Sequence, residues 1–236
     1  MTTKDLLLRL LMENRDYYLS GQSIGDELDI SRSAINKAAD GLRREGYEIE
    51  AVRNNGYVLR NDPCLMNQGE LAFYLGDERA GRIDCYTSVI STNVTVHELA
   101  EMGEESGYAV IADEQTGGRG HKGSDFRSPA GKGIYMSYLY RPAGVLKDSE
   151  KISPEVSKLA ANVLKKTAGI DASHKRSGDI MLQDKKIGGV LTEMLIEAES
   201  GYVRYVMIGI GIRPGRKVNR PKIAAGIISG LDEMFL

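Results

Sequence analysis

The sequence predicts an α+β fold in two parts, and three observations support this prediction. Leucine and isoleucine recur at helical spacing as far as Gly46, and two alternating runs joined by a turn follow at 47–60. From residue 83 onward, alternating runs are interleaved with three helical runs, which is typical of a largely antiparallel sheet with helices on one side. A polar stretch with Pro63 separates the two parts. We therefore expect domains at 1–62 and 81–236, joined by a linker with a short helix at 63–80.

The composition is that of an ordinary globular protein and excludes several classes. The 236 residues are 42% hydrophobic and 27% charged, with a net charge of −2, so DNA binding would have to come from a local basic patch. The only cysteines, Cys64 and Cys85, lack metal-ligand spacing. We therefore expect no disulfide and no metal, and a reducing cytoplasm fits. Because Arg9 interrupts the first apolar run, we expect no secretory signal, and no segment reaches the roughly 20 apolar residues that span a bilayer.

The first part has the element order of a winged helix-turn-helix. Residues 4–13 show an amphipathic helical pattern, and Ser20 and Ser31 stand where the N-caps of two further helices are expected. Gly46 is placed to end the third helix. The turn Asn54-Asn55-Gly56 then joins two alternating runs, which predicts a β-hairpin.

The third helix has the local charge expected of a surface that contacts DNA. Between residues 31 and 44 there are four basic residues and one acidic residue. Side chains on its exposed N-terminal turns, with one arginine of the hairpin, can reach base edges and phosphates. These candidates are Arg32, Ser33, Asn36, Lys37 and Arg53. A small helical interaction module with a solvated polar face is the alternative, and the order of elements with the local charge favours DNA binding.

The second part alternates predicted strands and helices. Strands are expected at 83–89, 108–114, 134–141 and, as three strands joined by turns at 183–184 and 200–201, within 179–212. Helices are expected at 91–107, 153–169 and 222–236.

A glycine-rich loop at 115–133 is the main candidate for chemistry. It contains six glycines and five basic or histidine residues, and successive glycine N–H groups can surround an anion. Gln115 opens the loop with an amide that can donate and accept. Phe126 can cover a flat ring or can equally anchor the loop in the core. Lys186 can point back toward the loop or can equally be an ordinary exposed turn lysine.

These segments together resemble the biotin protein ligase family, in its form with an N-terminal DNA-binding domain, over nearly the whole chain. The motifs are SRSAINK at 31–37, STN at 91–93, DEQTGGRGHKG at 113–123, KRSGD at 175–179, LQDKKIGGVLTE at 182–193 and GIGI at 209–212. The resemblance implies an α+β domain like that of biotin and lipoate ligases. It also implies an enzyme that joins biotin to ATP and transfers biotin from biotinyl-5′-AMP to a lysine of a carboxylase carrier domain.

The resemblance also implies a set of ligand-binding residues. The vitamin pocket would be lined by Ser91, Thr92, Asn93 and Gln115. The adenylate side would involve Gly118, Arg119, Gly120, His121, Phe126, Lys175, Asp179 and Lys186. If the chain is a ligase, Lys186 and Arg119 would be its catalytic residues, and ATP and Mg would be its cofactors.

Several departures from the family pattern fall on the ATP side. Arg176, Ser177 and Gly178 stand where the family has tryptophan, proline and asparagine, and His121 stands where it has a second arginine. Phe126 replaces a tryptophan, and Arg213 replaces an asparagine. The chain also ends before the small C-terminal β-domain of repressor-type ligases, so we expect that domain to be lacking. Because one lost donor at a developing charge costs about 10²–10³ in rate, we expect weak or absent ligase activity.

Three hypotheses follow from the sequence. The first, which we favour, is a transcription regulator of the biotin repressor type that binds biotin, biotinyl-5′-AMP or a related small acid. The second is an active biotin protein ligase that is also a repressor. The third is a sensor of a different small acidic ligand. We expect operator DNA and a small molecule as partners, a homodimer, and a carrier domain only if the chain is a ligase.

Overall fold

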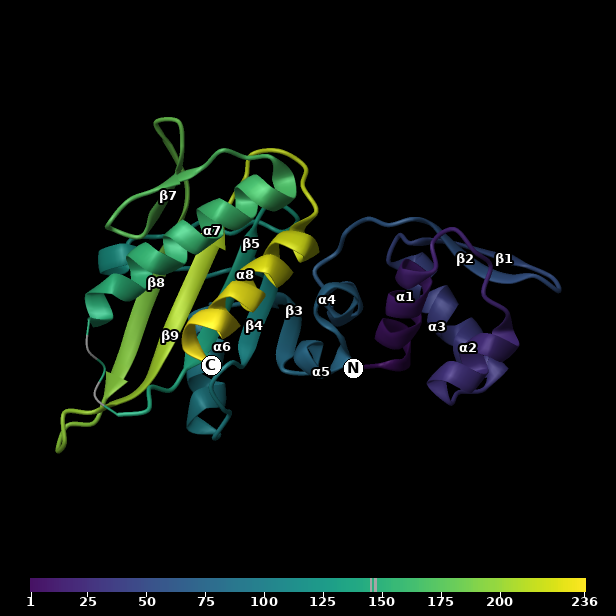
Figure 1. Ribbon diagram of the computed structural model, residues 1–236, viewed down its shortest axis with the longest axis horizontal. Coiled ribbons are helices and arrows are strands. Elements are labelled where there is room, and N and C mark those ends of the chain that lie inside the picture. Colours follow the sequence, from purple (N-terminus) through teal and green to yellow (C-terminus); the bar gives the residue numbers. More distant parts are fainter. Residues whose placement is uncertain (145, 147) are drawn as a thin grey trace. The chain divides into compact units, whose positions relative to one another are not determined.

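The computed structural model describes residues 1–144, 146 and 148–236, which form two compact units at Met1–Gly81 and Arg82–Leu236 (Figure 1). The first unit contains, besides residues 1–62, the short helices α4 (Gln68–Leu75) and α5 (Asp77–Ala80). The functional division at residues 62 and 80 stays a prediction.

The first unit has three helices followed by a hairpin. The elements are α1 (Thr3–Glu13), α2 (Gly21–Leu28), α3 (Arg32–Arg44), β1 (Glu48–Val52) and β2 (Gly56–Asn61). The hydroxyls of Ser20 and Ser31 accept hydrogen bonds from the backbone N–H groups of Ser23 and Ala34, as expected of N-caps. The strands β1 and β2 pair antiparallel.

The core of this unit is formed where the apolar faces of the helices meet. Leu7, Leu11, Ile24, Ile35 and Leu42 are fully buried there. Helix α4 packs closely on α1, because a Cβ at Gly69 would lie 2.8 Å from the backbone oxygen of Asp5. The linker helix is therefore part of the first unit in packing terms.

The second unit is built on a mixed seven-stranded sheet. Its strands are β3 (Ile83–Val89), β4 (Ala109–Gln115), β5 (Ile134–Tyr140), β6 (Ser173–His174), β7 (Asp179–Leu182), β8 (Lys185–Ile196) and β9 (Val203–Ile212). Their order in the sheet is β3-β4-β5-β9-β8-β7-β6. The β3–β4 pair is parallel and every other pair of the described strands is antiparallel, which confirms the predicted α+β class. The strand β6 was not expected from the sequence.

Helices cover both faces of the sheet, and this differs from the expectation of helices on one side. The helices are α6 (Thr92–Glu101), α7 (Ile152–Ala168) and α8 (Arg220–Phe235), with short 3-10 turns η1 (His121–Gly123) and η2 (Ser149–Lys151). On β5, Ser137 Oγ contacts Thr92 and Asn93 of α6, whereas the next residue, Tyr138, donates to Asp232 of α8. Neighbouring residues of a strand point to opposite faces, so α6 lies on the face opposite α8. In Figure 1, α7 and α8 run together across the near face of the sheet.

Within the described ranges, no helix has both the length and the hydropathy that a membrane span needs.

Candidate functional site

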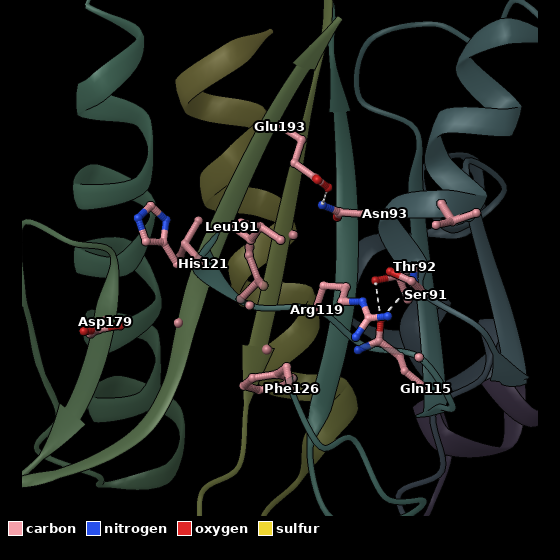
Figure 2. Close-up of a pocket in the computed structure, with 18 of the residues that line it drawn as sticks. Ser91, Thr92, Asn93, Gln115, Arg119, His121, Phe126, Asp179, Leu191 and Glu193 are labelled. Carbon is pink, nitrogen blue, oxygen red and sulfur yellow. Dashed lines mark hydrogen bonds between the residues drawn. The ribbon is translucent and has the colours of Figure 1, made fainter. Parts of the chain in front are cut away.

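A cavity of about 360 Å³ lies between the N-terminal end of α6, the glycine loop after β4, and strands β8 and β9 (Figure 2). Ten of the twelve predicted ligand-binding residues line it: Ser91, Thr92, Asn93, Gln115, Arg119, Gly120, His121, Phe126, Asp179 and Lys186. Gly118 and Lys175 do not line it. The fold thus brings together segments far apart in the sequence, as the contact between Asn93 and Glu193, 100 residues apart, illustrates.

Gln115 ties the start of α6 to the base of the loop. Its Oε1 accepts from the backbone N–H of Thr92 at 2.9 Å, and its Nε2 donates to Ser128 Oγ at 2.9 Å. Ser128 in turn donates to the backbone oxygen of Phe126 at 3.1 Å. Because both ends of the amide are engaged, the side chain is held rigidly at the cavity wall.

The glycine loop folds back on itself as a small ribbon. Phe126 N donates to Gly118 O, and Arg119 pairs with Asp125 in an isolated bridge. A Cβ at Gly118 would lie 2.6 Å from Phe126 O, so a glycine is needed for this close approach. The Arg119 guanidinium forms an ion pair with Asp125 at 2.6 Å, and both side chains are largely exposed. Arg119 is therefore already engaged by an acidic residue of its own loop.

Phe126 packs in the core, as one of the two interpretations expected, and its role in covering a ligand ring stays a prediction. Its ring lies over Gly211, where any Cβ would overlap it, and stands edge-on to Tyr135 with ring centroids 6.3 Å apart. It also lines the cavity. The guanidinium carbon of Arg213 lies 5.3 Å from the ring centroid, a distance typical of a cation–π contact. The residue that replaces the family asparagine thus covers one face of the ring.

Lys186 and Asp179 form an ion pair of 2.5 Å at the cavity edge. Burial alone would raise the pKa of the Asp179 carboxyl, but hydrogen bonds from Lys186 and Ser177 outweigh it and lower the pKa. The Lys186 side chain is 52% exposed, so its ammonium can reach a ligand in the cavity while its position is set by Asp179.

The structure explains why glycine is accommodated at position 178. Gly178 is buried with φ +84°, a conformation that side chains rarely adopt. A Cβ there would lie 3.1 Å from both Ser153 Cβ and Val190 O. The backbone of Gly178 accepts from Val190 N and donates to Lys175 O. The KRSGD segment therefore forms a tight turn beside the cavity. At position 178 it offers no side-chain amide.

Sequence reasoning missed Glu193 and Ser137. Glu193 lines the cavity and accepts a hydrogen bond of 2.6 Å from Asn93 Nδ2 (Figure 2). Ser137 is fully buried and donates to Asn93 Oδ1 at 2.5 Å. Each residue had one signal in the sequence. Glu193 lies at every second position of β8 with Leu191 and Gly189, and all three line the cavity. Ser137 is the single serine in the apolar strand IYMSYLY.

The cavity combines apolar walls with polar groups at its ends. Apolar side chains of Ile90, Val94 and Leu191 line it together with Thr92, Gln115 and Lys186. Such a site fits a small, mostly apolar ring that has hydrogen-bonding groups at one end and an acid at the other. In the described part of the chain, no group of three or more histidine, cysteine, aspartate or glutamate side chains is arranged to hold a metal ion.

The predicted DNA-contacting residues lie at the surface of the first unit. Arg32, Ser33, Asn36 and Lys37 are exposed on the N-terminal turns of α3, and Arg53 is exposed in the hairpin turn. Asn36 Oδ1 accepts a 2.5 Å hydrogen bond from the Tyr57 hydroxyl, which links α3 to β2. These positions are compatible with contacts to a DNA groove, and their role in DNA binding stays a prediction.

Comparisons with known protein families agree with this two-part organisation. A model of an HTH domain matches residues 3–58, and the model described as the biotin/lipoate A/B protein ligase family matches residues 86–212. The second match covers more than half of the chain.

Individual proteins are similar over almost all of the chain. The bifunctional ligase/repressor BirA of Bacillus subtilis (strain 168) is 37% identical over 219 residues, which cover 92% of this chain and 67% of that protein. The protein of the same name from Escherichia coli (strain K12) is 32% identical over 233 residues, which cover 96% and 69%. The chain thus spans about two thirds of the length of these relatives.

Solved structures share the fold of the second unit. A biotin acetyl coenzyme A carboxylase synthetase from Helicobacter pylori with bound biotinylated ATP superposes with a TM-score of 0.53 at 22% identity, over 64% of this chain and 73% of that one. A biotin protein ligase from Aquifex aeolicus in complex with biotin and ATP gives 0.53 at 24% identity, over 64% and 68%. At this identity the likeness shows the fold alone.

Proposed function

The chain belongs to the biotin/lipoate A/B protein ligase family, and from this premise we propose that it is a ligand-responsive, DNA-binding transcription regulator of the biotin repressor type. In this proposal, the cavity of the second unit binds biotin or biotinyl-5′-AMP, and α3 with the hairpin contacts operator DNA. Relatives that are similar over 92% and 96% of this chain are named bifunctional ligase/repressor.

One observation supports the proposal above the others: the fold gathers STN, Gln115 and Lys186 around one cavity of about 360 Å³. The rigid Gln115 amide and the Thr92 hydroxyl offer hydrogen bonds to a polar ring, while Lys186 offers a cation to a carboxylate. The apolar wall between them suits the hydrocarbon chain of biotin.

Calorimetry on the full chain tests ligand binding. We expect biotin to bind without ATP, because the groups on the vitamin side need no nucleotide.

A selection of duplexes from a random DNA library, with and without biotin, tests regulation. We expect a specific sequence to be enriched, and enriched more strongly with biotin. If no sequence is enriched without ligand, with biotin or with biotinyl-5′-AMP, the regulator proposal is wrong.

An active ligase is the second candidate, and the pairing of Lys186 with Asp179 favours it. These residues match the family positions that serve the reaction, and they are already in contact. Against it, Arg119 is paired with Asp125, and Gly178 has no side chain to hold phosphate or magnesium. Lost donors at a developing phosphate charge cost rate steeply. Incubation with biotin, ATP, Mg²⁺ and a biotin carrier domain tests it, and absence of both adenylate and biotinylated carrier would exclude it.

Native mass spectrometry of the purified chain tests whether a different small acid occupies the site. A retained mass other than that of biotin or its adenylate would favour the third hypothesis.

We further propose that the chain acts in the cytoplasm as a homodimer, since winged-helix regulators commonly bind paired half-sites with two-fold symmetry. Sedimentation with and without biotin measures the dimer directly.

A further inference from the structure

A groove of about 430 Å³ in the first unit lies between α3, the start of α2 and the hairpin of β1 and β2. Three of the five predicted DNA-contacting residues line it, namely Arg32, Asn36 and Arg53. Tyr57, which the sequence did not single out, lines it too. Contacts to base edges carry the sequence information in a protein–DNA interface, so the direction of the hydrogen bonds in this groove matters.

Tyr57 is held in place by the backbone of the segment that precedes α2. Leu19 N donates to Tyr57 O at 2.9 Å, and Tyr57 N donates back to Leu19 O at 2.8 Å. A Cβ at Gly56 would lie 1.9 Å from Leu19 O, so this close approach requires a glycine. The Tyr57 ring is half-buried against the core of the unit. Its hydroxyl therefore stands at a fixed place beside α3.

The Tyr57 hydroxyl orients the side-chain amide of Asn36, which is exposed on α3. Tyr57 Oη donates to Asn36 Oδ1 at 2.5 Å, at the short end of the range for O–H···O bonds. The amide nitrogen Nδ2 then points away from Tyr57, and among the described residues it has no hydrogen-bond acceptor. The amide of Gln22 differs, because its nitrogen already donates to Asp26 at 2.7 Å. Asn36 therefore presents a free donor to the groove.

Base edges in the major groove differ in what they offer to an amide nitrogen. Guanine presents the acceptors N7 and O6, adenine presents N7, and thymine presents O4. Cytosine presents only the donor N4–H₂, which cannot bond an amide nitrogen. An asparagine that is free to rotate can turn its oxygen to cytosine, whereas Asn36 would have to give up its bond with Tyr57 to do so.

We propose that Tyr57 is a specificity-determining residue of the first unit, because it holds Asn36 as a donor and so makes α3 reject cytosine at one position of its DNA site. The inference rests on the proposed function, which supplies the DNA. Tyr57 acts through Asn36 and does not itself need to touch a base.

Fluorescence anisotropy on single-base variants of the selected duplex tests the inference. Asn36→Ala identifies the base that Asn36 contacts, since the preference disappears there. In the unmodified chain, we expect cytosine at that position to weaken binding about 5- to 150-fold, the usual effect of one mismatched base pair. Tyr57→Phe should bring this ratio close to one, because the freed amide can turn its oxygen outward. The preferences at the other positions should stay unchanged.

A second set of variants separates the direction of the hydrogen bond from a general structural effect. Asn36→Asp still accepts from Tyr57 but presents an oxygen to the DNA, so we expect the preference to reverse in favour of cytosine. Adding Tyr57→Phe to Asn36→Asp should change the base ratio little, since a carboxylate presents oxygen in either orientation. Tyr18→Phe is the matched control, because the Tyr18 hydroxyl bonds Arg60 and Tyr18 does not line the groove.

The orientation of the Asn36 amide can also be observed without DNA. In neutron diffraction of the deuterated full chain, we expect deuterium on Tyr57 Oη along the line to Asn36. We also expect the deuterated amide nitrogen to face away from Tyr57. An amide nitrogen that faces Tyr57 would overturn the inference.

The outcomes distinguish the inference from the proposed function. If the unmodified chain enriches a sequence but Tyr57→Phe rejects cytosine as strongly, the inference is wrong and the proposed function stands. If Tyr57→Phe also abolishes the reversed preference of Asn36→Asp, Tyr57 acts on the structure alone and the inference is again wrong. If the unmodified chain enriches no sequence with or without biotin or biotinyl-5′-AMP, the proposed function fails and the inference fails with it.

Discussion

Lys186 and Lys185 are neighbours in β8, and only Lys186 lines the cavity. Replacing Lys186 by methionine keeps most of the side-chain volume and removes the charge. Because a hydrogen bond to a charged group contributes about 1.5–3 kcal/mol, we expect Lys186→Met to weaken biotin binding by roughly 10- to 150-fold. Calorimetry at neutral pH measures this. Lys185→Met is the matched control and should change affinity little; equal losses in both variants would contradict the proposed role.

Because Gly211 has no side chain, the Phe126 ring can occupy the space above it. An alanine Cβ at Gly211 would overlap the ring, whereas at Gly189, also on the cavity wall, the nearest atom would be 3.6 Å away. We expect Gly211→Ala to destabilise the second unit by about 1–3 kcal/mol, since overpacking forces neighbouring atoms to shift. Gly189→Ala should change stability by much less. Thermal unfolding followed by circular dichroism compares the two, and similar midpoints would show that Phe126 is not held by this contact.

Single residues were predicted unevenly. STN, Gln115 and Lys186 were expected at the site because their motif spacing is characteristic, and they line the cavity. Glu193 and Ser137 were not expected, because their importance comes from partners on other strands and helices. A sequence shows that a serine lies in an apolar strand, but not which polar atoms meet it there.

At the scale of elements, α3 offers a surface whose charge can be removed stepwise. Arg32 and Lys37 are exposed on it. We expect Lys37→Ala to weaken binding to the selected duplex and to reduce the slope of log affinity against log salt by about 1, as for one lost phosphate contact. Lys158→Ala, on the exposed side of α7, is the control. Fluorescence anisotropy at several salt concentrations gives the slope, and an unchanged slope would exclude a phosphate contact.

Helix α4 contains a fully buried carboxyl at Glu70. The Tyr47 hydroxyl donates to Glu70 Oε1 at 2.9 Å, and Asn67 donates to the same hydroxyl at 2.8 Å. Burial, together with the neighbouring carboxylate of Asp62, raises the pKa of Glu70 from its ordinary 4.5 to about 9. The raised pKa keeps Glu70 protonated at neutral pH.

The raised pKa predicts how the attachment of α4 depends on pH. Below pH 4.5 Glu70 holds its proton in both the folded and the unfolded state, so its contribution to the free energy of unfolding is fully present. Between 4.5 and about 9 only the folded state holds it, so stability falls as pH rises, by at most about 1.4 kcal/mol per pH unit. We expect the opening free energy of α4 amides, from hydrogen exchange, to fall with pH. Glu70→Gln should remove the slope and exposed Glu78→Gln should keep it; a slope retained in Glu70→Gln would contradict this assignment.

Most elements were predictable because their signals are local. Ser20 and Ser31 mark helix starts, and the turns at 183–184 and 200–201 separate strands at 179–212 much as the structure does. The helix expected at 91–107 ends earlier, at Glu101, and Gly103 follows with φ +101°. The two-residue strand β6 is too short for a periodic pattern. The face on which α6 packs has no local signal at all.

At the scale of the whole molecule, the proposed function links two units that fold around separate cores. If biotin strengthens binding to the selected duplex by a certain factor, that duplex must strengthen biotin binding by the same factor. We expect a factor of about 5–150, the usual range of coupling free energies. Calorimetry with biotin, with and without the duplex, and DNA titrations, with and without biotin, measure both sides. A scrambled duplex should show no effect, and a factor of one on both sides would show that the units are independent.

The sequence by itself determined the α+β class, nearly all helices and strands, the winged-helix order of the first unit, and the family of the second. The class and the elements follow from periodicity, caps and turns, which act over short stretches of chain, and the family follows from the resemblance of the motifs. Only the tertiary structure decided that α6 and α8 cover opposite faces, that Phe126 rests on Gly211, and that Asn93 joins Glu193 to Ser137. Such contacts depend on strand order and register, which bring distant residues within hydrogen-bonding distance and which no local pattern encodes.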